Sequence, residues 1–498
     1  MTELAYSLGQ RLAVGFDGPE IPEEFAELVR TYHVGNVILF RRNVVSGAQL
    51  RRLCAELNAL ILQETGLPPF IMMDEECGSV SRLAHIGTPT PGAMAIGATG
   101  SAANAYAVGH MIGEELRSVG VNLNLAPVLD ANTNPENPVI GVRSFGGDPA
   151  LVSEMGIAYA RGLQEAGVLA CGKHFPGHGD TETDSHIGLP VVEKSAEEVR
   201  RVELASFRAA IGAGIDAMMT AHVIFPALEP ERIPATVSRR VLTGLLREEM
   251  GFDGLIISDG MEMKAVMDLY GIEDATRRAL NAGVDVALIC HSAKQASDTL
   301  ELLYRAAEDG GLDLAAHDAA MARIRRAKAR LGVSQGDPAA FGSENHRAQA
   351  WQIMREAVRV LHAPEGKTLP VLGQDALFFG TDCVEMSQAS DAESMNAAKA
   401  LAEALGGTWL PDPLACRAAL LDSACGRKIV LTLAHSDPDL SDQISLGNAL
   451  ADAGAQVIAV AMTTPYCLDL LSDRVWKAAA YQYDRLSLAA VAKLLGGR

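Results

Sequence analysis

The sequence predicts an α/β protein, with an N-terminal (β/α)8 TIM barrel followed by a smaller α/β sandwich domain. Between residues 12 and 291, short apolar runs rich in Val and Ile alternate with longer stretches of helical period, which is the pattern of repeated βα units in a parallel sheet. Eight such units occur, and this number closes a barrel. We expect the strands at residues 12–17, 34–40, 69–74, 121–128, 167–173, 216–221, 254–258 and 284–290.

The remaining third of the chain predicts the second domain. A helix over 315–332 is expected to close the barrel region, and the Gly-, Pro- and Ser-containing stretch VSQGDPAAFGSEN that follows is typical of a linker. A helix near 346–362 and further apolar runs then alternate again. We therefore expect three parts: a catalytic barrel domain at 1–333, a linker at 334–345 and an α/β sandwich domain at 346–498.

Composition and charge exclude several classes of function. The 498 residues are 48% hydrophobic and 21% charged, which is ordinary for a globular protein. The formal net charge of -20 opposes binding to nucleic acid or to an anionic membrane, whereas neutral sugars remain permitted as ligands. No apolar run reaches membrane-spanning length. The sequence predicts no particular oligomeric state.

The start of the chain and the cysteines predict a cytoplasmic protein, and the missing nucleotide motifs predict that it has no cofactor. The segment MTELAYSLGQRLAVGF lacks the basic stretch, apolar core and cleavage site of a secretory signal. The eight cysteines have no CxxC spacing, which fits reduced thiols better than disulfides. No GxGxxG or P-loop pattern indicates a nucleotide, and we expect neither a cofactor nor a metal.

Most of the predicted strands end in a residue able to take part in chemistry. These residues are Asp17, Asp74, Asp130, His174, His222, Asp259 and His291. Barrel enzymes place their active sites at the carboxyl ends of the strands. Because Asp also caps helices at strand-to-helix turns, we expect about half of these residues to be caps rather than catalytic groups.

The segment KHFPGHGDTETDSHIGLP, residues 173–190, is the strongest candidate for a catalytic loop. Three histidines, three acids and a lysine crowd one loop after a predicted strand, and such density is costly without a use. Within it, Asp184 and His186 are close enough for the carboxylate to orient the imidazole, which can then donate and recover a proton near neutral pH.

The segment GFDGLIISDGMEM, residues 251–263, delivers a second candidate group. Its apolar run places Asp259 at the end of the seventh strand, where a carboxylate can attack carbon or cap the next helix. The histidine loop opposite favours the nucleophile. Side chains able to bond the hydroxyls of a pyranose ring are Asp74, Glu75, Arg82, Arg143, Lys173 and His174. Four further side chains are expected only to stabilise their loops: Glu76, His178, Asp180 and Glu182.

These motifs support a resemblance to a known family. The segment KHFPGHGDTETDSHIGLP closely resembles the characteristic loop of bacterial exo-β-N-acetylglucosaminidases in glycoside hydrolase family 3. PVLDANTNPENPVIGVRSFG at 127–146 and PATVSRRVLTGLLREEMGFDGLIISDGMEM at 234–263 support it in the order that the family has them. The resemblance implies a barrel fold and a retaining enzyme that removes terminal β-linked N-acetylglucosamine from a carbohydrate of muropeptide or chitin type.

The resemblance also implies roles for individual residues. Asp259 would attack the anomeric carbon, and His186, oriented by Asp184, would protonate the leaving oxygen, so that an Asp/His dyad replaces the usual acid/base carboxyl. Residues that would contact the sugar are Asp74, Arg82, Arg143, Lys173 and His174, with His222 nearby. The chain departs from the family at Cys77, Gly78 and Ser79, where two glycines and an arginine are usual, and at Gly260, where many relatives have a second Asp.

Three alternatives remain open from the sequence. A histidine acid/base would also suit a phosphorylase, because a neutral imidazole does not repel phosphate. A metal-dependent amidohydrolase is suggested by His174, His178, His186, His222 and Asp259, although paired HxH spacing is missing. A silent sugar-binding regulator is opposed by the intact Asp259, Asp184 and His186.

Overall fold

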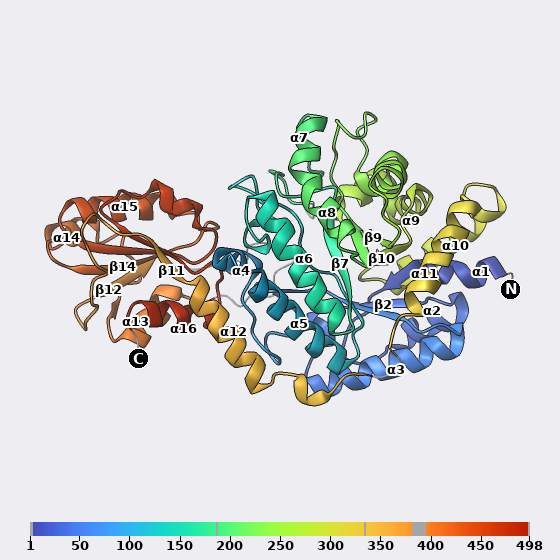
Figure 1. Cartoon of the computed structure of the whole chain (residues 1–498), viewed down its shortest axis with the longest axis horizontal. Coiled ribbons are helices and arrows are strands. Elements are labelled where there is room, and N and C mark those ends of the chain that lie inside the picture. The colour runs from blue at the N-terminus through green and yellow to red at the C-terminus, as the bar shows by residue number, and fades with distance from the viewer. Residues whose placement is uncertain (1–2, 186–187, 333–334, 381–394, 497–498) are drawn as a thin grey trace.

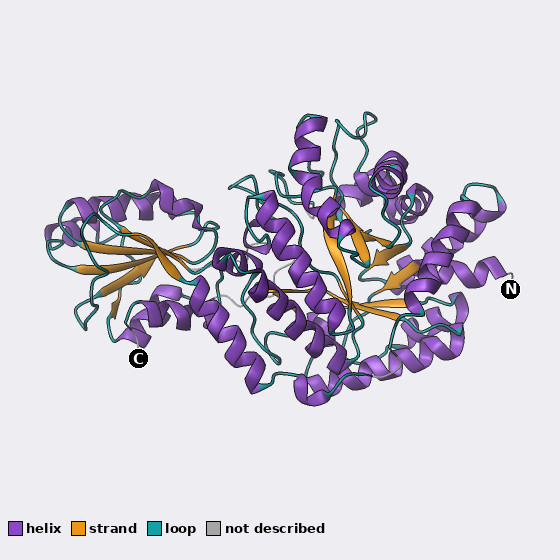
Figure 2. Ribbon diagram, viewed as in Figure 1, coloured by secondary structure: helices purple, strands orange, loops and turns teal. Residues whose placement is uncertain are grey.

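The structure is a computed structural model that describes residues 3–185, 188–332, 335–380 and 395–496. Figures 1 and 2 show a barrel wrapped in helices and, beside it, a smaller sheet covered by helices on both faces. Both predicted parts of the fold are thus confirmed. Among the described residues, no helix is both long and apolar enough to cross a membrane.

The barrel is closed by eight parallel strands in the order β1-β10-β9-β8-β7-β6-β3-β2. Each coincides with one of the eight predicted runs. The strands are β1 (Leu12–Val14), β2 (Asn36–Leu39), β3 (Phe70–Met73), β6 (Leu123–Asn124), β7 (Leu169–Phe175), β8 (Ala217–Thr220), β9 (Leu255–Gly260) and β10 (Val286–Ile289). Most are shorter than expected. The run at 121–128 shortens most, and Pro127 within it has no N–H for the ladder.

Helices follow the strands and cover the outside of the barrel. They are α1 (Glu3–Leu8), α2 (Glu23–Tyr32), α3 (Gly47–Thr65), α4 (Ala93–Thr99), α5 (Ala102–Val119), α6 (Pro149–Glu165), α7 (Ala196–Arg201), α8 (Glu203–Gly212), α9 (Lys264–Ala282), α10 (Ala293–Glu308) and α11 (Leu314–Lys328). Between β8 and β9 the covering helix η5 (Arg240–Glu249) has π-type hydrogen bonding. Several begin at a capping side chain, as at Ser46, whose hydroxyl accepts from the Gln49 nitrogen.

Two hydrophobic cores lie on opposite faces of the barrel strands, because successive side chains of a strand point in opposite directions. Ile38, Met72 and Ile257 belong to the core inside the barrel. Their neighbours Val37 and Ile256 belong to the core between the strands and the helices. This burial of both faces explains why the strands read as continuous apolar runs.

The second domain contains a six-stranded sheet in the order β11-β16-β15-β14-β12-β13, parallel except for β11. Helices cover both of its faces (Figure 2). Its strands are β11 (Arg359–His362), β12 (Leu377–Gly380), β13 (Thr408–Trp409), β14 (Lys428–Leu433), β15 (Gln456–Ala461) and β16 (Trp476–Ala479). Its helices are α12 (Glu344–Ala357), α13 (Ala397–Leu405), α14 (Arg417–Asp422), α15 (Leu440–Asp452) and α16 (Arg485–Leu494).

One expected element of this domain is wrong. The helix expected near 346–362 ends at Ala357, and 359–362 form the edge strand β11. The sequence RVLH alternates exposed and half-buried residues, which suits an edge strand better than a helix. The domain boundaries at residues 333 and 346 stay a prediction.

The two domains share part of one hydrophobic core. Met94 and Ala95 of α4, and Val142 of the 3-10 turn η3 (Gly141–Arg143), pack within the core of the second domain although they come from the barrel. The short hairpin of β4 (Glu75–Cys77) and β5 (Val80–Ser81) extends from the barrel rim after β3. The second domain therefore supports loops at one side of the barrel mouth.

Candidate active site

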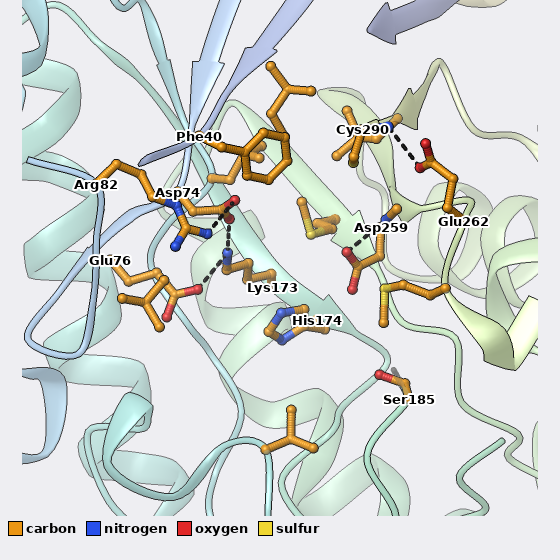
Figure 3. A pocket seen from close by; sticks show the side chains of 18 of the residues that line it. Phe40, Asp74, Glu76, Arg82, Lys173, His174, Ser185, Asp259, Glu262 and Cys290 are labelled. Carbon is orange, nitrogen blue, oxygen red and sulfur yellow. Dashed lines mark hydrogen bonds and ion pairs between the residues drawn. The ribbon is translucent and has the colours of Figure 1, made fainter. Parts of the chain in front are cut away.

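A cavity of about 570 Å³ opens at the carboxyl ends of the barrel strands. Its lining follows from the direction of the side chains inside the barrel. Phe40, Asp74, Lys173, Asp259 and Cys290 each stand two residues after an inward-facing core residue of β2, β3, β7, β9 and β10. Figure 3 shows these side chains surrounding the cavity. The strands therefore present a ring of mainly polar groups above an apolar floor.

Asp259 presents a half-buried carboxylate to this cavity. Its Oδ1 accepts a hydrogen bond from the nitrogen of Gly260 at 2.8 Å. In Figure 3 the carboxylate faces Lys173 and His174 across the cavity. A fixed carboxylate opposite a polar wall is the arrangement that a nucleophile attacking a bound sugar requires.

The wall opposite Asp259 is a buried network of two cations and two carboxylates. Lys173 Nζ lies 2.6 Å from Asp74 Oδ1 and 2.6 Å from Glu76 Oε1. Arg143 binds Glu76 in a bidentate manner, with Nε–Oε2 and Nη2–Oε1 distances of 2.8 and 2.7 Å. Burial opposes ionisation of Glu76, but Arg143 and Lys173 outweigh it and hold the pKa of this carboxyl well below its usual range. The network is therefore charged and rigid.

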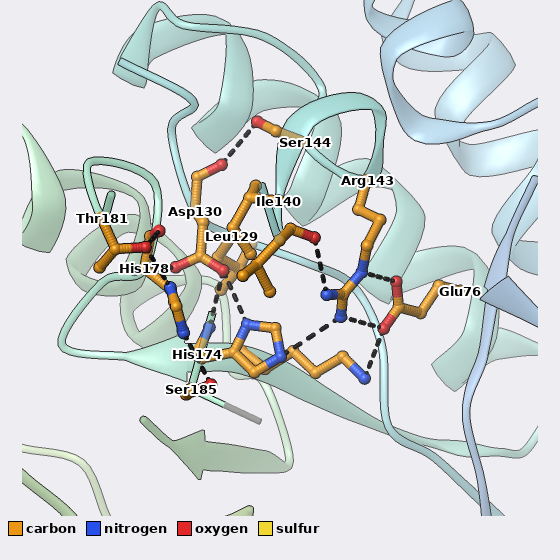
Figure 4. Close-up of polar contacts among 12 residues, drawn as sticks. Glu76, Leu129, Asp130, Ile140, Arg143, Ser144, His174, His178, Thr181 and Ser185 are labelled. Carbon is orange, nitrogen blue, oxygen red and sulfur yellow. Dashed lines mark hydrogen bonds and ion pairs between the residues drawn. The ribbon is translucent and has the colours of Figure 1, made fainter. Parts of the chain in front are cut away.

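A second buried carboxylate, Asp130, holds His174 at the end of β7 and His178 in the loop that follows (Figure 4). Its Oδ2 lies 2.8 Å from His174 Nδ1 and its Oδ1 accepts from the His178 nitrogen at 2.7 Å. Burial raises the pKa of Asp130, but the hydrogen bonds from His174 and His178 more than offset this and hold it below its usual range. Because an ionised carboxylate only accepts, His174 Nδ1 donates, which leaves Nε2 to accept from Arg143 Nη2 at 3.4 Å.

The loop expected to contain the acid/base pair closes one side of the cavity. His186 lies outside the described residues, and Asp184 is buried. Ser185, which follows Asp184 in the sequence, lines the cavity. Its Oγ lies 3.0 Å from His178 Nε2, and its carbonyl accepts a hydrogen bond from the Ala265 nitrogen at 3.4 Å. Burial lowers the pKa of His178 to about 4, so this ring is neutral near pH 7. His178 thus anchors the loop.

The structure separates the predicted binding residues into two groups. Those that line the cavity are Asp74, Arg82, Arg143, Lys173 and His174, and Arg82 Nη2 lies 3.5 Å from Asp74 Oδ2. His222 does not line it. Its ring nitrogens lie 2.8 Å from Thr236 Oγ1 and 2.9 Å from the Gly260 carbonyl. His222 therefore supports the backbone beside Asp259.

Sequence reasoning missed several residues at the site. Glu76, expected only to stabilise its loop, lines the cavity and joins Arg143 to Lys173. Glu262 was not singled out, although its carboxylate accepts from the nitrogens of Cys290 and His291 at 2.7 and 2.8 Å. Phe40 lines the mouth and stacks on His291, with ring centroids 5.5 Å apart. Its position two residues after the inward-facing Ile38 was the available signal.

The three histidines of the amidohydrolase alternative that the structure describes, His174, His178 and His222, have other partners. Among the residues that the structure describes, no three His, Cys, Asp or Glu side chains are grouped so that they could hold a metal ion. His174 and His178 are bonded to Asp130, Thr181 and Ser185 instead.

Comparison with known proteins decides the family. Residues 4–327 match the glycosyl hydrolase family 3 N-terminal domain. The chain belongs to glycoside hydrolase family 3. The resemblance predicted from the sequence is thereby confirmed. Beta-hexosaminidase A of Pseudoalteromonas piscicida is 38% identical over 364 residues, which cover 68% of this chain and 61% of that relative. A beta-hexosaminidase of Thiobacillus denitrificans is 40% identical over 276 residues, covering 54% of this chain and 75% of the relative.

Solved structures resemble this chain over both of its domains. A family 3 beta-N-acetylglucosaminidase from Paenibacillus sp. str. FPU-7 has a TM-score of 0.88 and 34% identity, covering 99% of this chain and 97% of that one. A beta-glucoside phosphorylase has a TM-score of 0.81 at 21% identity, which shows a shared fold alone. The family 3 fold, with its second domain, therefore extends over the whole chain.

Proposed function

We propose that this protein is a retaining, exo-acting β-N-acetylglucosaminidase that removes terminal β-linked N-acetylglucosamine through a covalent glycosyl-enzyme. The observation that carries the proposal is the half-buried carboxylate of Asp259 opposite the Lys173, Asp74 and Glu76 network across one cavity. The names of the relatives, beta-hexosaminidase and beta-N-acetylglucosaminidase, support the choice of sugar. The enzyme class is that of the family, a glycoside hydrolase.

In the first step, an Asp259 carboxylate oxygen forms a bond to the anomeric carbon while the bond from that carbon to the leaving oxygen breaks. The leaving oxygen takes a proton from the imidazolium of His186, which Asp184 orients. In the second step, neutral His186 removes a proton from water, and the water oxygen displaces Asp259. Two inversions retain the β configuration.

The buried network positions the sugar in this scheme. Asp74 and the Arg82 guanidinium supply acceptors and donors for ring hydroxyls, and Lys173 adds an ammonium that is held charged. Burial lowers the pKa of Lys173, but Asp74 and Glu76 outweigh this and raise it above its usual value. Arg143, from the turn whose Val142 packs in the core of the second domain, and His174 of β7 complete the wall. Because these groups are already paired, little reorganisation is needed when a sugar binds.

Phosphate is the alternative acceptor in the second step. It would yield N-acetylglucosamine 1-phosphate, and we place hydrolysis first because relatives with over 30% identity are named beta-hexosaminidase. We also propose a cytoplasmic role in peptidoglycan recycling, on muropeptide or chitin-type saccharides. The seven cysteines that the structure describes are free thiols, five of them buried, which supports a reducing compartment.

The proposal is tested by turnover of wild type and Asp259→Asn with 4-nitrophenyl β-N-acetylglucosaminide and 4-nitrophenyl β-glucoside, each with and without phosphate. We expect wild type to prefer the acetylated sugar, to release the β-anomer first and to be unaffected by phosphate. The variant should lose at least about 10³-fold in kcat, the scale of losing a principal catalytic group. Preference for the glucoside would overturn the substrate assignment, and a phosphate-dependent sugar 1-phosphate would overturn hydrolysis.

A further inference from the structure

The loop after β7 is held on the side of the active-site cavity by Asp130 and His178 (Figure 4). Asp130 Oδ1 accepts from the His178 nitrogen at 2.7 Å, and His178 Nε2 lies 3.0 Å from Ser185 Oγ. The chain leads from Ser185 directly into His186. Asp180 of the same loop does not line the cavity and makes a separate set of contacts. The loop is therefore held at two places.

The second place of attachment is Lys194, which also lies outside the cavity. Its Nζ is 3.0 Å from Asp180 Oδ1 and 2.6 Å from Glu203 Oε1. The same Nζ donates to Thr133 Oγ1 at 3.3 Å, and that hydroxyl donates to Asp180 Oδ1 at 3.0 Å. Thr133 belongs to the loop after β6 and Glu203 is the first residue of α8. One ammonium group thus joins the loop after β7 to two neighbouring parts of the barrel.

The Lys194 ammonium is charged and shielded from solvent. Burial lowers the pKa of Lys194, but the hydrogen bonds to Glu203 and Asp180 outweigh this and raise it above its usual value. The side chain of Lys194 is 22% exposed and that of Glu203 4%, so water and salt screen this pair less than a surface ion pair. Such a contact can keep a loop in one place.

The backbone of the loop also contacts Glu203 directly. Gly177 has a φ of +142°, and a Cβ built on it would lie 2.8 Å from Glu203 Cβ. The loop can approach α8 this closely because residue 177 has no side chain. Glu203 therefore supports the loop at Gly177 by packing and at Asp180 through Lys194.

We propose that Lys194 is a positioning residue for acid/base catalysis, which acts through Asp180 on the loop that supplies the proton. This inference rests on the proposed function, in which His186 protonates the leaving oxygen. Lys194 touches neither the sugar nor the leaving group in this assignment. A displacement of about 1 Å can cost a reaction about 10²-fold in rate, so a residue outside the cavity can control the proton transfer.

The test compares two aryl β-N-acetylglucosaminides whose leaving groups differ in their need for a proton. 2,4-Dinitrophenolate leaves as a stable anion, whereas 4-methoxyphenolate needs a proton as the bond breaks. The readout is kcat/KM, which reports the first chemical step for both substrates. Lys194→Met should lose about tenfold on the methoxyphenyl substrate, a part of the roughly 10²–10⁴-fold that acid catalysis contributes, and less than about twofold on the dinitrophenyl substrate. Lys194→Arg, which keeps a cation, should recover most of this loss.

Two further variants separate the positioning role from stability. Glu193→Gln is the control, because this adjacent residue forms an exposed ion pair with Arg232 and should match wild type on both substrates. Lys194→Met leaves the buried Glu203 without its ammonium partner, so Lys194→Met with Glu203→Gln is measured as well and should show the same selective loss. Equal losses on both substrates, no loss on the methoxyphenyl substrate, or a matching loss in Glu193→Gln would overturn the positioning role.

Amide hydrogen exchange tests the attachment of the loop without catalysis. Peptides that cover residues 177–185 should exchange faster in Lys194→Met than in wild type or Glu193→Gln, because the loop opens more readily once the Asp180 contact is lost. Unchanged exchange would show that Lys194 does not hold the loop. If wild type cleaves neither substrate, the proposed function fails, and the exchange measurement alone then decides whether Lys194 fixes this segment.

Discussion

Asp130 and His174 form a buried pair in which one carboxylate oxygen lies 2.8 Å from the ring Nδ1 and also accepts from the His174 backbone nitrogen at 3.1 Å. The other oxygen accepts from the His178 nitrogen. One buried carboxylate thus fixes both the ring and the backbone of the segment that enters the catalytic loop.

Replacing Asp130 with Asn should impair both activity and stability. An amide must turn its NH2 group toward one of these N–H donors, and an unsatisfied buried donor costs about 1–3 kcal/mol. We expect kcat/KM to fall by roughly tenfold to a hundredfold, since 1.36 kcal/mol is tenfold. Steady-state kinetics and denaturant unfolding measure the two effects. Asp148→Asn, at an exposed helix cap in the neighbouring loop, should leave both unchanged.

Glu76→Gln should raise KM by about tenfold or more, because Arg143 and Lys173 would lose the shared carboxylate that aligns them. The variant should also be less stable than wild type at neutral pH. Because the folded pKa of Glu76 is depressed, its stabilisation is present above the unfolded value of about 4.3 and is lost as pH falls below it. The stability difference between the proteins should therefore shrink between pH 5 and 3.5, and a difference that grows there would refute this assignment.

For Glu75 we predict the opposite dependence of stability on pH. Burial raises the pKa of this carboxyl to about 8, although Ser81 and the Leu83 nitrogen donate to it. The folded protein therefore binds a proton between about pH 4.5 and 8 that the unfolded chain has released, and its stability falls as pH rises through this window, by up to about 1.4 kcal/mol per unit. Glu75→Gln mimics the neutral acid, so the variant should exceed wild type in free energy of unfolding at pH 8 but not at pH 5. Parallel curves for both proteins would show that Glu75 is charged when folded.

Tyr466→Phe tests whether the second domain positions the Arg143 turn. The Tyr466 hydroxyl accepts from Asn132 Nδ2 at 3.2 Å, and Asn132 Oδ1 in turn accepts from the Gly141 nitrogen at 3.0 Å. Loss of this hydrogen bond, which contributes about 1 kcal/mol, should raise KM about two- to fivefold with little change in kcat. Tyr106→Phe, which removes an exposed bond to Glu165 far from the site, is the control and should have no effect. An unchanged KM in Tyr466→Phe would mean that the turn is held by the barrel alone.

The barrel was predictable from sequence because its strands are buried on both faces. Each strand is therefore a continuous run of apolar residues in the sequence. The edge strand β11 was not, since RVLH has one exposed face and follows a helix without a break. Within the site, Asp259, Asp74 and Lys173 could be located from the sequence, because every second side chain of a barrel strand points into the barrel. His222 could not be placed among them by its strand-end position alone, because its ring is bonded to Thr236 and to the Gly260 carbonyl and does not line the cavity.

Glu76 shows the limit of reading residues one at a time. Its role depends on Arg143, 67 residues later, and on Lys173, and pairings between three distant segments leave no local pattern. The Asp130 pair with His174 is of the same kind, at a separation of 44 residues. The second domain's contribution was equally hidden, since Tyr466 and Asn132 meet only through the tertiary fold.

The role of Asp259 is tested most directly by trapping the covalent intermediate. With a 5-fluoro N-acetylglucosaminyl fluoride as substrate, the enzyme should form the glycosyl ester quickly and hydrolyse it slowly. Peptide mass spectrometry should then find the sugar attached to the enzyme. We predict a single label on Asp259, absent from Asp259→Asn. A label on another carboxylate, or full turnover of the natural linkage by Asp259→Asn, would contradict the assignment.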